Sequence, residues 1–256
     1  MLKDLYEYRE MLRNLVIRDL RGRYKNSALG FLWTFLNPLF QLIIYTFVFS
    51  VIMPMAIEKY YIHLFVALVP WIFFSSCMTG GSRVILDQQD MVKKIYFPRE
   101  ILPLSFTTSQ FINMILSMCV TFLIVICSGH GINPRAVLYL PIVFVVQYLL
   151  CLGIVMICSA ITVYLRDMEM ILGVVSFAWM YLTPVIYSEN YVPERYRALY
   201  NLNPMTPIIV AYRKILYYKE VPELSNLLMA GLVGIAGVVI GSVVFKKLQK
   251  GFVEEL

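Results

Sequence analysis

The stretch VLYLPIVFVVQYLLCLGIVMICSAITVY (137–164) contains no charged residue, and it indicates the fold class of the chain. A helix of about 20 apolar residues matches the roughly 30 Å thickness of the hydrocarbon core of a bilayer. In lipid each backbone amide must find its partner within its own segment, so this run predicts a helix that crosses the membrane. A transmembrane β-barrel would show short segments of alternating polarity, and these residues do not alternate.

Five further apolar runs lie on either side of this stretch. The residues are 60% hydrophobic and only 15% charged, with a mean hydropathy of +0.72, which a soluble chain of this length would not tolerate. The sequence therefore predicts an all-α integral membrane protein forming one transmembrane domain over 1–256. It predicts six spans, near 31–53, 60–82, 102–127, 137–164, 170–187 and 227–245.

Two connecting segments have amphipathic patterns of their own. In residues 1–26, Leu5, Leu12 and Val16 fall on one helical face and Glu7 on the other, which predicts a helix lying on the membrane surface. An ordinary solvated helix is the alternative. Residues 189–225 are rich in tyrosine and are interrupted by four prolines, which favours short helices that dip into the outer leaflet. A static aromatic belt at the interface is the alternative there.

The distribution of basic residues predicts the orientation. Fifteen of the 22 lysines and arginines lie in the termini and in the connections around 83–100 and 166–169, and seven lie in the other connections. Cytoplasmic loops carry such an excess, so both termini and the 83–100 loop are expected to be cytoplasmic. This bias explains the net charge of +6 without a nucleic-acid partner.

The sequence contains no recognisable catalytic or metal-binding constellation. It lacks a GxxxxGK[ST] phosphate loop and a Cys-x-x-Cys pair, and His63 and His130 are far apart. The five cysteines lie in or beside apolar runs, as small buried hydrophobes do. Nearly all acidic residues lie in the connections, whereas ion-coupled carriers keep an ionisable group at membrane depth. We therefore expect no catalytic residue, no metal and no cofactor bound by this chain, and an energy source elsewhere.

The loop RVILDQQDMVKKIYFPRE (83–100) mixes charges with apolar and aromatic residues. Exposed aromatics beside charges are typical of a docking surface for a protein partner. A solvated turn between two spans is the alternative. The candidate docking residues are Asp90, Lys93, Lys94, Tyr96, Phe97, Pro98, Arg99 and Glu100.

Three groups of motifs carry a family resemblance. They are RDLRGRYKNSALGFLWTFLNPLFQLIIYTFVF (18–49), VKKIYFPREILP (92–103), and Arg166-Asp167 followed by TPVIY (183–187) and NPMTP (203–207). In this order they resemble the permeases of bacterial ATP-binding-cassette exporters of polysaccharides. The resemblance is nearest to the O-antigen exporters, and it does not separate them from teichoic acid or capsule exporters. Thr183 departs mildly from the pattern, where the family often has serine.

The resemblance implies a transport subunit rather than an enzyme. Two copies would form a channel in the bacterial inner membrane, each binding one cytoplasmic ATPase subunit that holds ATP and Mg²⁺. The 83–100 loop would dock there as a coupling helix, spans one and five would line the conduit, and short helices in 189–225 would close its periplasmic end. The substrate would be an undecaprenyl-linked polysaccharide. The alternatives are a permease for drugs or small lipids, and an intramembrane enzyme acting on lipid-linked glycans.

Two sets of candidate substrate contacts follow. Sugar rings have apolar C–H faces that stack on aromatic side chains, so aromatics of spans one and five are candidates for the channel wall. For each of them, contact with lipid or packing in the core is the alternative. Guanidinium groups bind pyrophosphate oxygens, so basic residues before the first span are candidates for head-group recruitment, with topology alone as the alternative. The channel set is Trp33, Phe35, Tyr45, Phe177, Trp179, Tyr181 and Tyr187, and the head-group set is Arg18, Arg21, Arg23 and Lys25.

Overall fold

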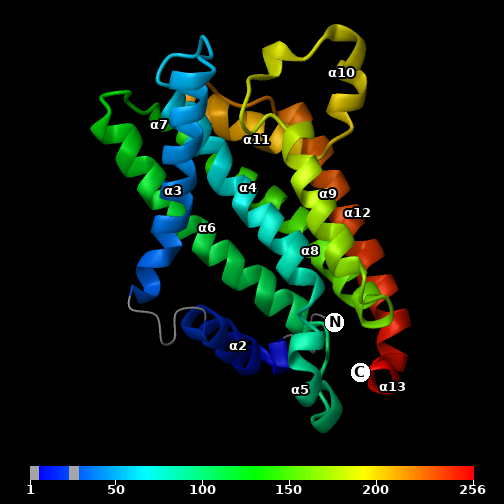
Figure 1. Ribbon diagram of the computed structural model, residues 1–256. Coiled ribbons are helices and arrows are strands. Elements are labelled where there is room, and N and C mark those ends of the chain that lie inside the picture. The colour runs from blue at the N-terminus through cyan, green and yellow to red at the C-terminus, as the bar shows by residue number, and fades with distance from the viewer. Residues whose placement is uncertain (1–5, 23–28) are drawn as a thin grey trace.

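The computed structural model describes residues 6–22 and 29–256, and in these ranges it contains helices and connections but no strand (Figure 1). The helices begin with α2 (Arg9–Gly22), α3 (Trp33–Phe47, continued by a π-helical turn Val48–Ile52), α4 (Tyr60–Ser82), α5 (Gln89–Lys94) and α6 (Ile101–Cys127). They continue with α7 (Pro134–Val137), α8 (Leu140–Tyr164), α9 (Met168–Leu182), α10 (Glu194–Asn201), α11 (Met205–Arg213, continued by a π-helical turn Lys214–Tyr218), α12 (Leu224–Leu248) and α13 (Phe252–Glu255).

Five of the six predicted spans are helices long and apolar enough to cross a membrane. They comprise Trp33–Ile52, Tyr60–Ser82, Ile101–Cys127, Pro134–Tyr164 and Leu224–Glu255. The all-α membrane fold is thereby confirmed. The two ends of the molecule are easily told apart in Figure 1: α2, α5 and α13 lie at one end, called the terminal end, and α7, α10 and α11 lie at the opposite end, called the far end.

The fifth predicted span differs from the expectation of a helix over 170–187. α9 has only 15 residues, about 22 Å of helix, and it ends before Pro184 because a residue preceding proline avoids the α region. Thr183 is accordingly extended, with φ −113° and ψ 142°. The chain then continues as buried irregular backbone from Thr183 to Ile186.

Buried backbone that is not helical needs partners within the protein for its carbonyl groups. The buried Arg213 donates to the carbonyl oxygens of Val185 at 2.7 Å and Tyr187 at 2.8 Å. The hydroxyl of Tyr60 donates to the carbonyl of Ile186 at 2.8 Å. These bonds replace the last turn of helix that the proline prevents.

α4 is the central helix of the domain. It packs on α3, α6, α8, α9 and α11, and residues all around it, including Leu64, Phe65 and Phe74, are fully buried. A helix that is apolar on every side belongs in the core. The other spans surround α4 and each exposes an apolar face, as expected for helices in contact with lipid or with another subunit.

α8 and α12 form the closest helix pair, because glycines face each other where they cross. A Cβ atom added at Gly153 would lie 2.5 Å from the backbone carbon of Gly237, and one added at Gly241 would lie 3.0 Å from the carbonyl oxygen of Gly153. The Gly237-x-x-x-Gly241 motif therefore brings two helices of one chain together, as small residues do in membranes.

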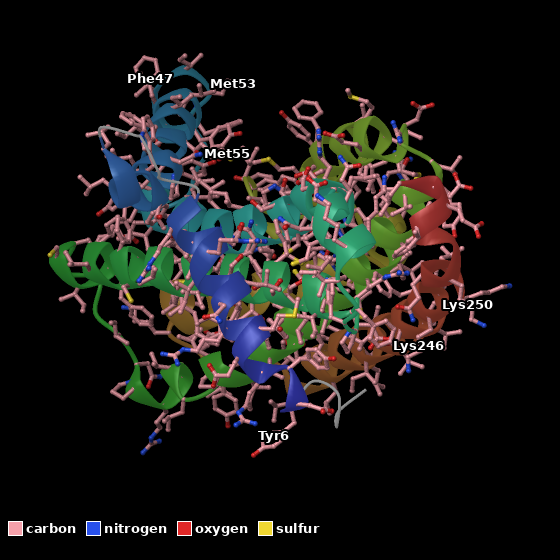
Figure 2. The ribbon with its side chains drawn as sticks, turned by 90° about the horizontal axis from the view of Figure 1, so that it is seen from below. Tyr6, Phe47, Met53, Met55, Lys246 and Lys250 are labelled. Atoms are coloured by element: carbon pink, nitrogen blue, oxygen red, sulfur yellow. The ribbon has the colours of Figure 1, made fainter. Side chains whose placement is uncertain are left out.

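Within the segment 1–26, for which an amphipathic helix on the membrane surface is predicted, Arg9–Gly22 form α2, which lies across the terminal end beneath α6 (Figures 1 and 2). Residues 1–5 and 23–26 lie outside the described residues, and the membrane-surface position stays a prediction. Leu15 and Val16 form the buried face of α2. The hydroxyl of Ser109 in α6 donates to the carboxylate of Asp19, so this acid lies on the packed side of α2.

Candidate functional site

The 83–100 loop projects from the terminal end as a 3₁₀ turn (Leu86–Gln88) and α5, followed by a return to α6. Asp90, Lys93 and Lys94 are exposed, and Lys94 lies 3.5 Å from Asp90. Tyr96 is 96% exposed, the most prominent aromatic of the loop. Pro98 and Arg99 are half-buried.

Phe97 and Glu100 are predicted to lie on the exposed surface of the loop, but both are buried. Phe97 is 5% exposed and Glu100 is 8% exposed. Phe97 belongs to a second apolar cluster at the terminal end, together with residues of α2, α12 and α13 such as Leu15, Phe245 and Phe252. The expectation of an exposed Phe97 is wrong because Phe97 packs into this cluster, and Ile95 and Tyr96 remain as the exposed apolar tip.

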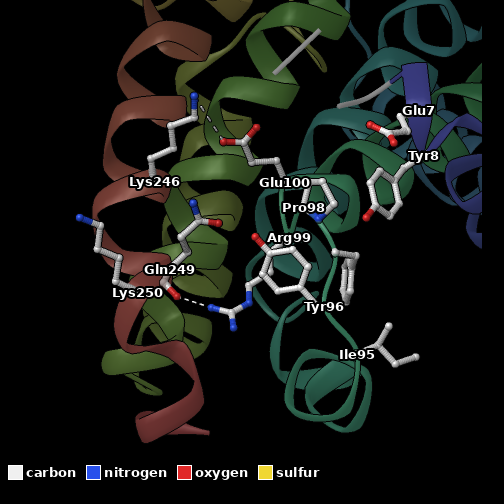
Figure 3. Close-up of a pocket in the computed structure, with 11 residues that line it drawn as sticks. Glu7, Tyr8, Ile95, Tyr96, Pro98, Arg99, Glu100, Lys246, Gln249 and Lys250 are labelled. Atoms are coloured by element: carbon white, nitrogen blue, oxygen red, sulfur yellow. Dashed lines mark hydrogen bonds and ion pairs between the residues drawn. The ribbon is translucent and has the colours of Figure 1, made fainter. Parts of the chain in front are cut away.

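A pocket of about 590 Å³ lies beside this tip, and Figure 3 shows its lining. The loop forms one wall, the end of α12 forms the other, and Glu7 and Tyr8 close it from the N-terminal side. Arg99 donates to the carbonyl oxygen of Gln249, and Lys246 lies 4.0 Å from Glu100. The loop is thus fixed to the end of α12, and Tyr96 and the charged groups of α5 remain exposed.

The predicted channel aromatics do not share one surface. Between α3 and α9 lies a cleft of about 360 Å³ with α4 at its floor, called here the middle cleft, and Phe177 lines it. Trp33 lines a smaller neighbouring pocket of about 140 Å³ on the other side of α3. Phe35 and Tyr45 line neither, and Tyr45 packs against the core.

The middle cleft is also lined by uncharged polar groups that sequence reasoning missed. Asn37 in α3 accepts a hydrogen bond from Gln41 at 2.8 Å, and the hydroxyls of Ser75 in α4 and Ser176 in α9 are 2.8 Å apart. Thr79 and Ser76 lie in the same wall. These single hydroxyls and amides are scattered in apolar runs, so only the fold shows that they share one surface.

At the far end, Trp179, Tyr181 and Tyr187 come together in an aromatic pocket of about 770 Å³, called here the outer pocket. Three tyrosines outside the predicted set complete it, Tyr191, Tyr196 and Tyr200. The indole of Trp179 donates to the side-chain oxygen of Asn203 at 3.0 Å. The high tyrosine content of 189–225 was the sequence signal that could have identified these three residues as part of the site.

The segment 189–225 divides into two unlike parts. Residues 189–203, with α10, lie at the surface over the outer pocket, whereas α11 and the turn after it are core elements. Met205, Ile208, Tyr212 and Ile215 are fully buried. Short helices are present in this segment as predicted, and of these α11, with the turn after it, packs against α4, α8 and α12.

The predicted head-group set is only partly described. Arg23 and Lys25 lie outside the described residues. Arg18 donates to the side-chain oxygen of Gln88 at 2.7 Å, which links α2 to the 83–100 loop. Arg21 is exposed at the end of α2. Arg21 is thus the one described member whose position suits an external anion, because Arg18 already has a partner.

Among the described residues no group of histidine, cysteine or acidic side chains could hold a metal ion. The five cysteines are free thiols; Cys77, Cys151 and Cys158 are buried, and Cys119 and Cys127 are exposed. Instead, the described surfaces have an exposed loop with a pocket beside it at one end, a polar cleft in the middle and an aromatic pocket at the other end.

Residues 10–217 match the family model described as ABC-2 type transporter. The chain belongs to the ABC-2 type transporter family. The O-antigen export system permease protein RfbA of Myxococcus xanthus is 33% identical over 258 residues, covering 100% of this chain and 99% of the relative. Two proteins of that name from Klebsiella pneumoniae are each 28% identical, covering 96% of this chain and 95% of the relative. This ABC-2 subunit is therefore a multi-pass transport subunit rather than an enzyme.

Proposed function

We propose that the chain is the channel-forming permease subunit of an ATP-driven exporter that moves an O-antigen-like, lipid-linked polysaccharide across the bacterial inner membrane. One observation carries the proposal: relatives named for O-antigen export match this chain over nearly the whole length of both proteins. The middle cleft and the outer pocket support it, because together they offer hydroxyls, amides and aromatic faces without a charged wall.

The excess of lysine and arginine at the terminal end supports a cytoplasmic position for both termini and for the 83–100 loop. The far end, with α10 and the outer pocket, would then face the periplasm. Export would proceed from the end that carries Tyr96 toward the end that carries Trp179.

A second copy of the chain would complete the conduit. α3 and α9 border the middle cleft, and each also has a broad unpacked face. Ile43, Met170 and Val174 are 62%, 74% and 71% exposed. Two copies that place these helices face to face would enclose the cleft, and the remaining apolar surface would meet lipid.

The energy would come from two cytoplasmic ATPase subunits, one for each copy, which bind ATP and Mg²⁺ in their own sites. This chain has no phosphate-binding loop, and its 83–100 loop presents an exposed aromatic tip between charged groups. Exposed aromatics of this kind act as anchors in protein interfaces. The tip at Ile95 and Tyr96 would insert into the ATPase subunit.

The wall chemistry suits an undecaprenyl-linked glycan. Sugar hydroxyls can exchange hydrogen bonds with Asn37, Gln41 and Thr79 in the middle cleft, and their C–H faces can stack on the tyrosines of the outer pocket. Contacts of this kind are individually weak, and a conduit must release what it binds.

The test is reconstitution of the chain with its cognate ATPase in vesicles loaded with lipid-linked polymer on the cytoplasmic side. ATP-dependent delivery of polymer to the other side is the expected result, and an ATPase variant that cannot hydrolyse ATP is the control. Transport of small lipids or drugs without polymer would overturn the proposal in favour of the drug or lipid exporter. Modification of the glycan without transport would favour the enzyme.

A further inference from the structure

Two connections at the terminal end, far apart in sequence, are joined by an ion pair. Arg83 follows α4 directly, and Glu169 lies in the first turn of α9. One guanidinium nitrogen of Arg83 donates to both carboxylate oxygens of Glu169, at 2.8 and 3.0 Å. The hydrogen bonds from Arg83 to Glu169, more than any other contact, raise the pKa of Arg83 above its usual value. Asp87, in the 83–100 loop, lies 3.5 Å from the other side of the guanidinium.

This geometry places one cation between the docking loop and the start of α9. The side chains of Arg83 and Glu169 are 49% and 33% exposed, and exposed ion pairs contribute little to stability. Because this ion pair adds little to folding stability and yet connects the 83–100 loop to α9, a role in transmitting motion is favoured. The ion pair also lies where α9 begins, so a shift of Arg83 acts on the first turn of that helix.

Apart from this pair, α9 is supported mainly along one face. It packs mainly on α4, with a smaller contact on α8, and its opposite face is exposed along its length. The hydroxyls of Ser75 and Ser176 meet at mid-length, and Phe74 packs edge-on against Trp179 with 5.3 Å between ring centroids. At the far end Tyr60 bonds to the carbonyl of Ile186.

α4 and α9 are thus linked at their inner ends, in the middle and at their outer ends. α4 continues directly into the docking loop, and α9 continues into the segment 189–203 over the outer pocket. Packed helices with discrete contacts are the physical means by which a shift at one site reaches another. The pair therefore connects the docking loop to the outer pocket through contacts at both ends and in the middle.

We infer that the ion pair between Arg83 and Glu169 is the transmission contact that passes movement of the 83–100 loop to α9. Both residues are positioning residues: they touch neither ATP nor polymer. The inference rests on the proposed function, because it concerns how ATP hydrolysis in the partner reaches the conduit.

The experiment measures polymer exported per ATP hydrolysed in the reconstituted complex. Glu169→Gln keeps the size of the side chain and removes its charge. It should leave ATP hydrolysis and assembly near the wild-type level and lower the export ratio about tenfold, within the usual range of coupling between sites. Glu10→Gln is the matched control, since it removes an acid at the same end and, within the described residues, breaks only the pair with Arg13 inside α2.

A charge swap provides the rescue. Arg83→Glu with Glu169→Arg should restore most of the ratio in an Asp87→Asn background, where the new glutamate meets no like charge. If Glu169→Gln fails to assemble, Glu169→Asp keeps the charge, withdraws the carboxylate by one methylene, and should lower the same ratio. An unchanged ratio in the assembled variant, or a swap that rescues nothing, would overturn the ion-pair role alone. A wild-type complex that moves no polymer would overturn the proposed function and this inference with it.

Discussion

The guanidinium of Arg213 donates to the carbonyl oxygen of Val185 at 2.7 Å, with no carboxylate among its hydrogen-bonding partners in the described chain. Arg213 is 3% exposed, and its other bonds go to the carbonyls of Tyr187 and His63. Burial lowers the pKa of Arg213 to about 10, so the side chain keeps its charge at neutral pH. A buried cation thus holds together the end of α9, α4 and α11.

Replacing Arg213 should destabilise the far end. Arg213→Met fills similar space and leaves the carbonyl groups of Val185 and Tyr187 without this donor, which should cost about 2 kcal/mol or more. The expected result is a lower unfolding midpoint of the purified chain in detergent. Arg213→Lys can donate to only some of these carbonyl groups, so its unfolding midpoint should lie between those of the wild type and Arg213→Met. An Arg213→Met variant as stable as the wild type would contradict the anchoring role.

The crossing of α8 and α12 makes a second, purely steric prediction. Gly153→Ala would place a methyl group 2.5 Å from the backbone of Gly237, so the helices must separate, at a cost of about 1–3 kcal/mol. Gly231→Ala is the control on α12, because its methyl group would meet only Val146 at an ordinary 3.5 Å. Thermal unfolding should distinguish the two, and equal midpoints would mean that the crossing tolerates expansion.

Composition and run length predicted most of this fold, because the thickness of a bilayer constrains helix length more strictly than water does. The end of α9 was also marked locally, by Thr183 before Pro184. The burial of Phe97 was not predictable, since its partners Phe245 and Phe252 are about 150 residues away. The same holds for Ser75 and Ser176, whose shared surface depends on how two spans pack.

In the docking loop, alanine substitutions of the neighbouring aromatics Tyr96 and Phe97 should have different effects. Tyr96→Ala removes a side chain that is 96% exposed, so the chain should keep its stability. If Tyr96 is an interface anchor, binding of the ATPase subunit should weaken by about 2 kcal/mol, roughly 30-fold in Kd. Phe97→Ala should instead destabilise the chain itself by about 3–5 kcal/mol, because it empties part of a packed cluster.

Copurification and unfolding midpoints separate these outcomes. Unchanged ATPase affinity in the Tyr96→Ala variant would remove the aromatic tip from the interface. A stable Phe97→Ala variant with weakened ATPase binding would return Phe97 to the docking surface.

The head-group hypothesis now depends mainly on Arg21. Arg21→Gln should weaken binding of an anionic pyrophosphate lipid by about 1 kcal/mol, roughly fivefold, since one cation near the membrane surface is lost. Arg18→Gln removes the bond to Gln88 and should act on the docking loop as well. Titration with lipid-linked substrate gives the affinities, and labelling of the exposed Cys127 verifies orientation. Normal affinity in a correctly oriented Arg21→Gln variant would leave only the topological role.

The segment 189–203 is the part of the far end that can act as a gate. It lies over the outer pocket, and both of its ends are fixed: Arg213 holds Tyr187, and Asn203 donates to the hydroxyl of Thr183 at 2.8 Å. A segment held at two neighbouring points can move without disturbing the core beneath it. A static aromatic belt would have the same composition, so only mobility distinguishes the two.

Crosslinking tests that mobility. A cysteine at the exposed Arg197, introduced where Cys119 and Cys127 have been replaced by serine, would allow the segments of two copies to be joined. Assembly and ATPase binding should be unaffected, whereas polymer export should stop and should recover when a reductant breaks the crosslink. Export at the wild-type rate by the crosslinked complex would show that 189–203 does not need to move. In that case the aromatic residues would serve only to anchor the protein at the membrane interface.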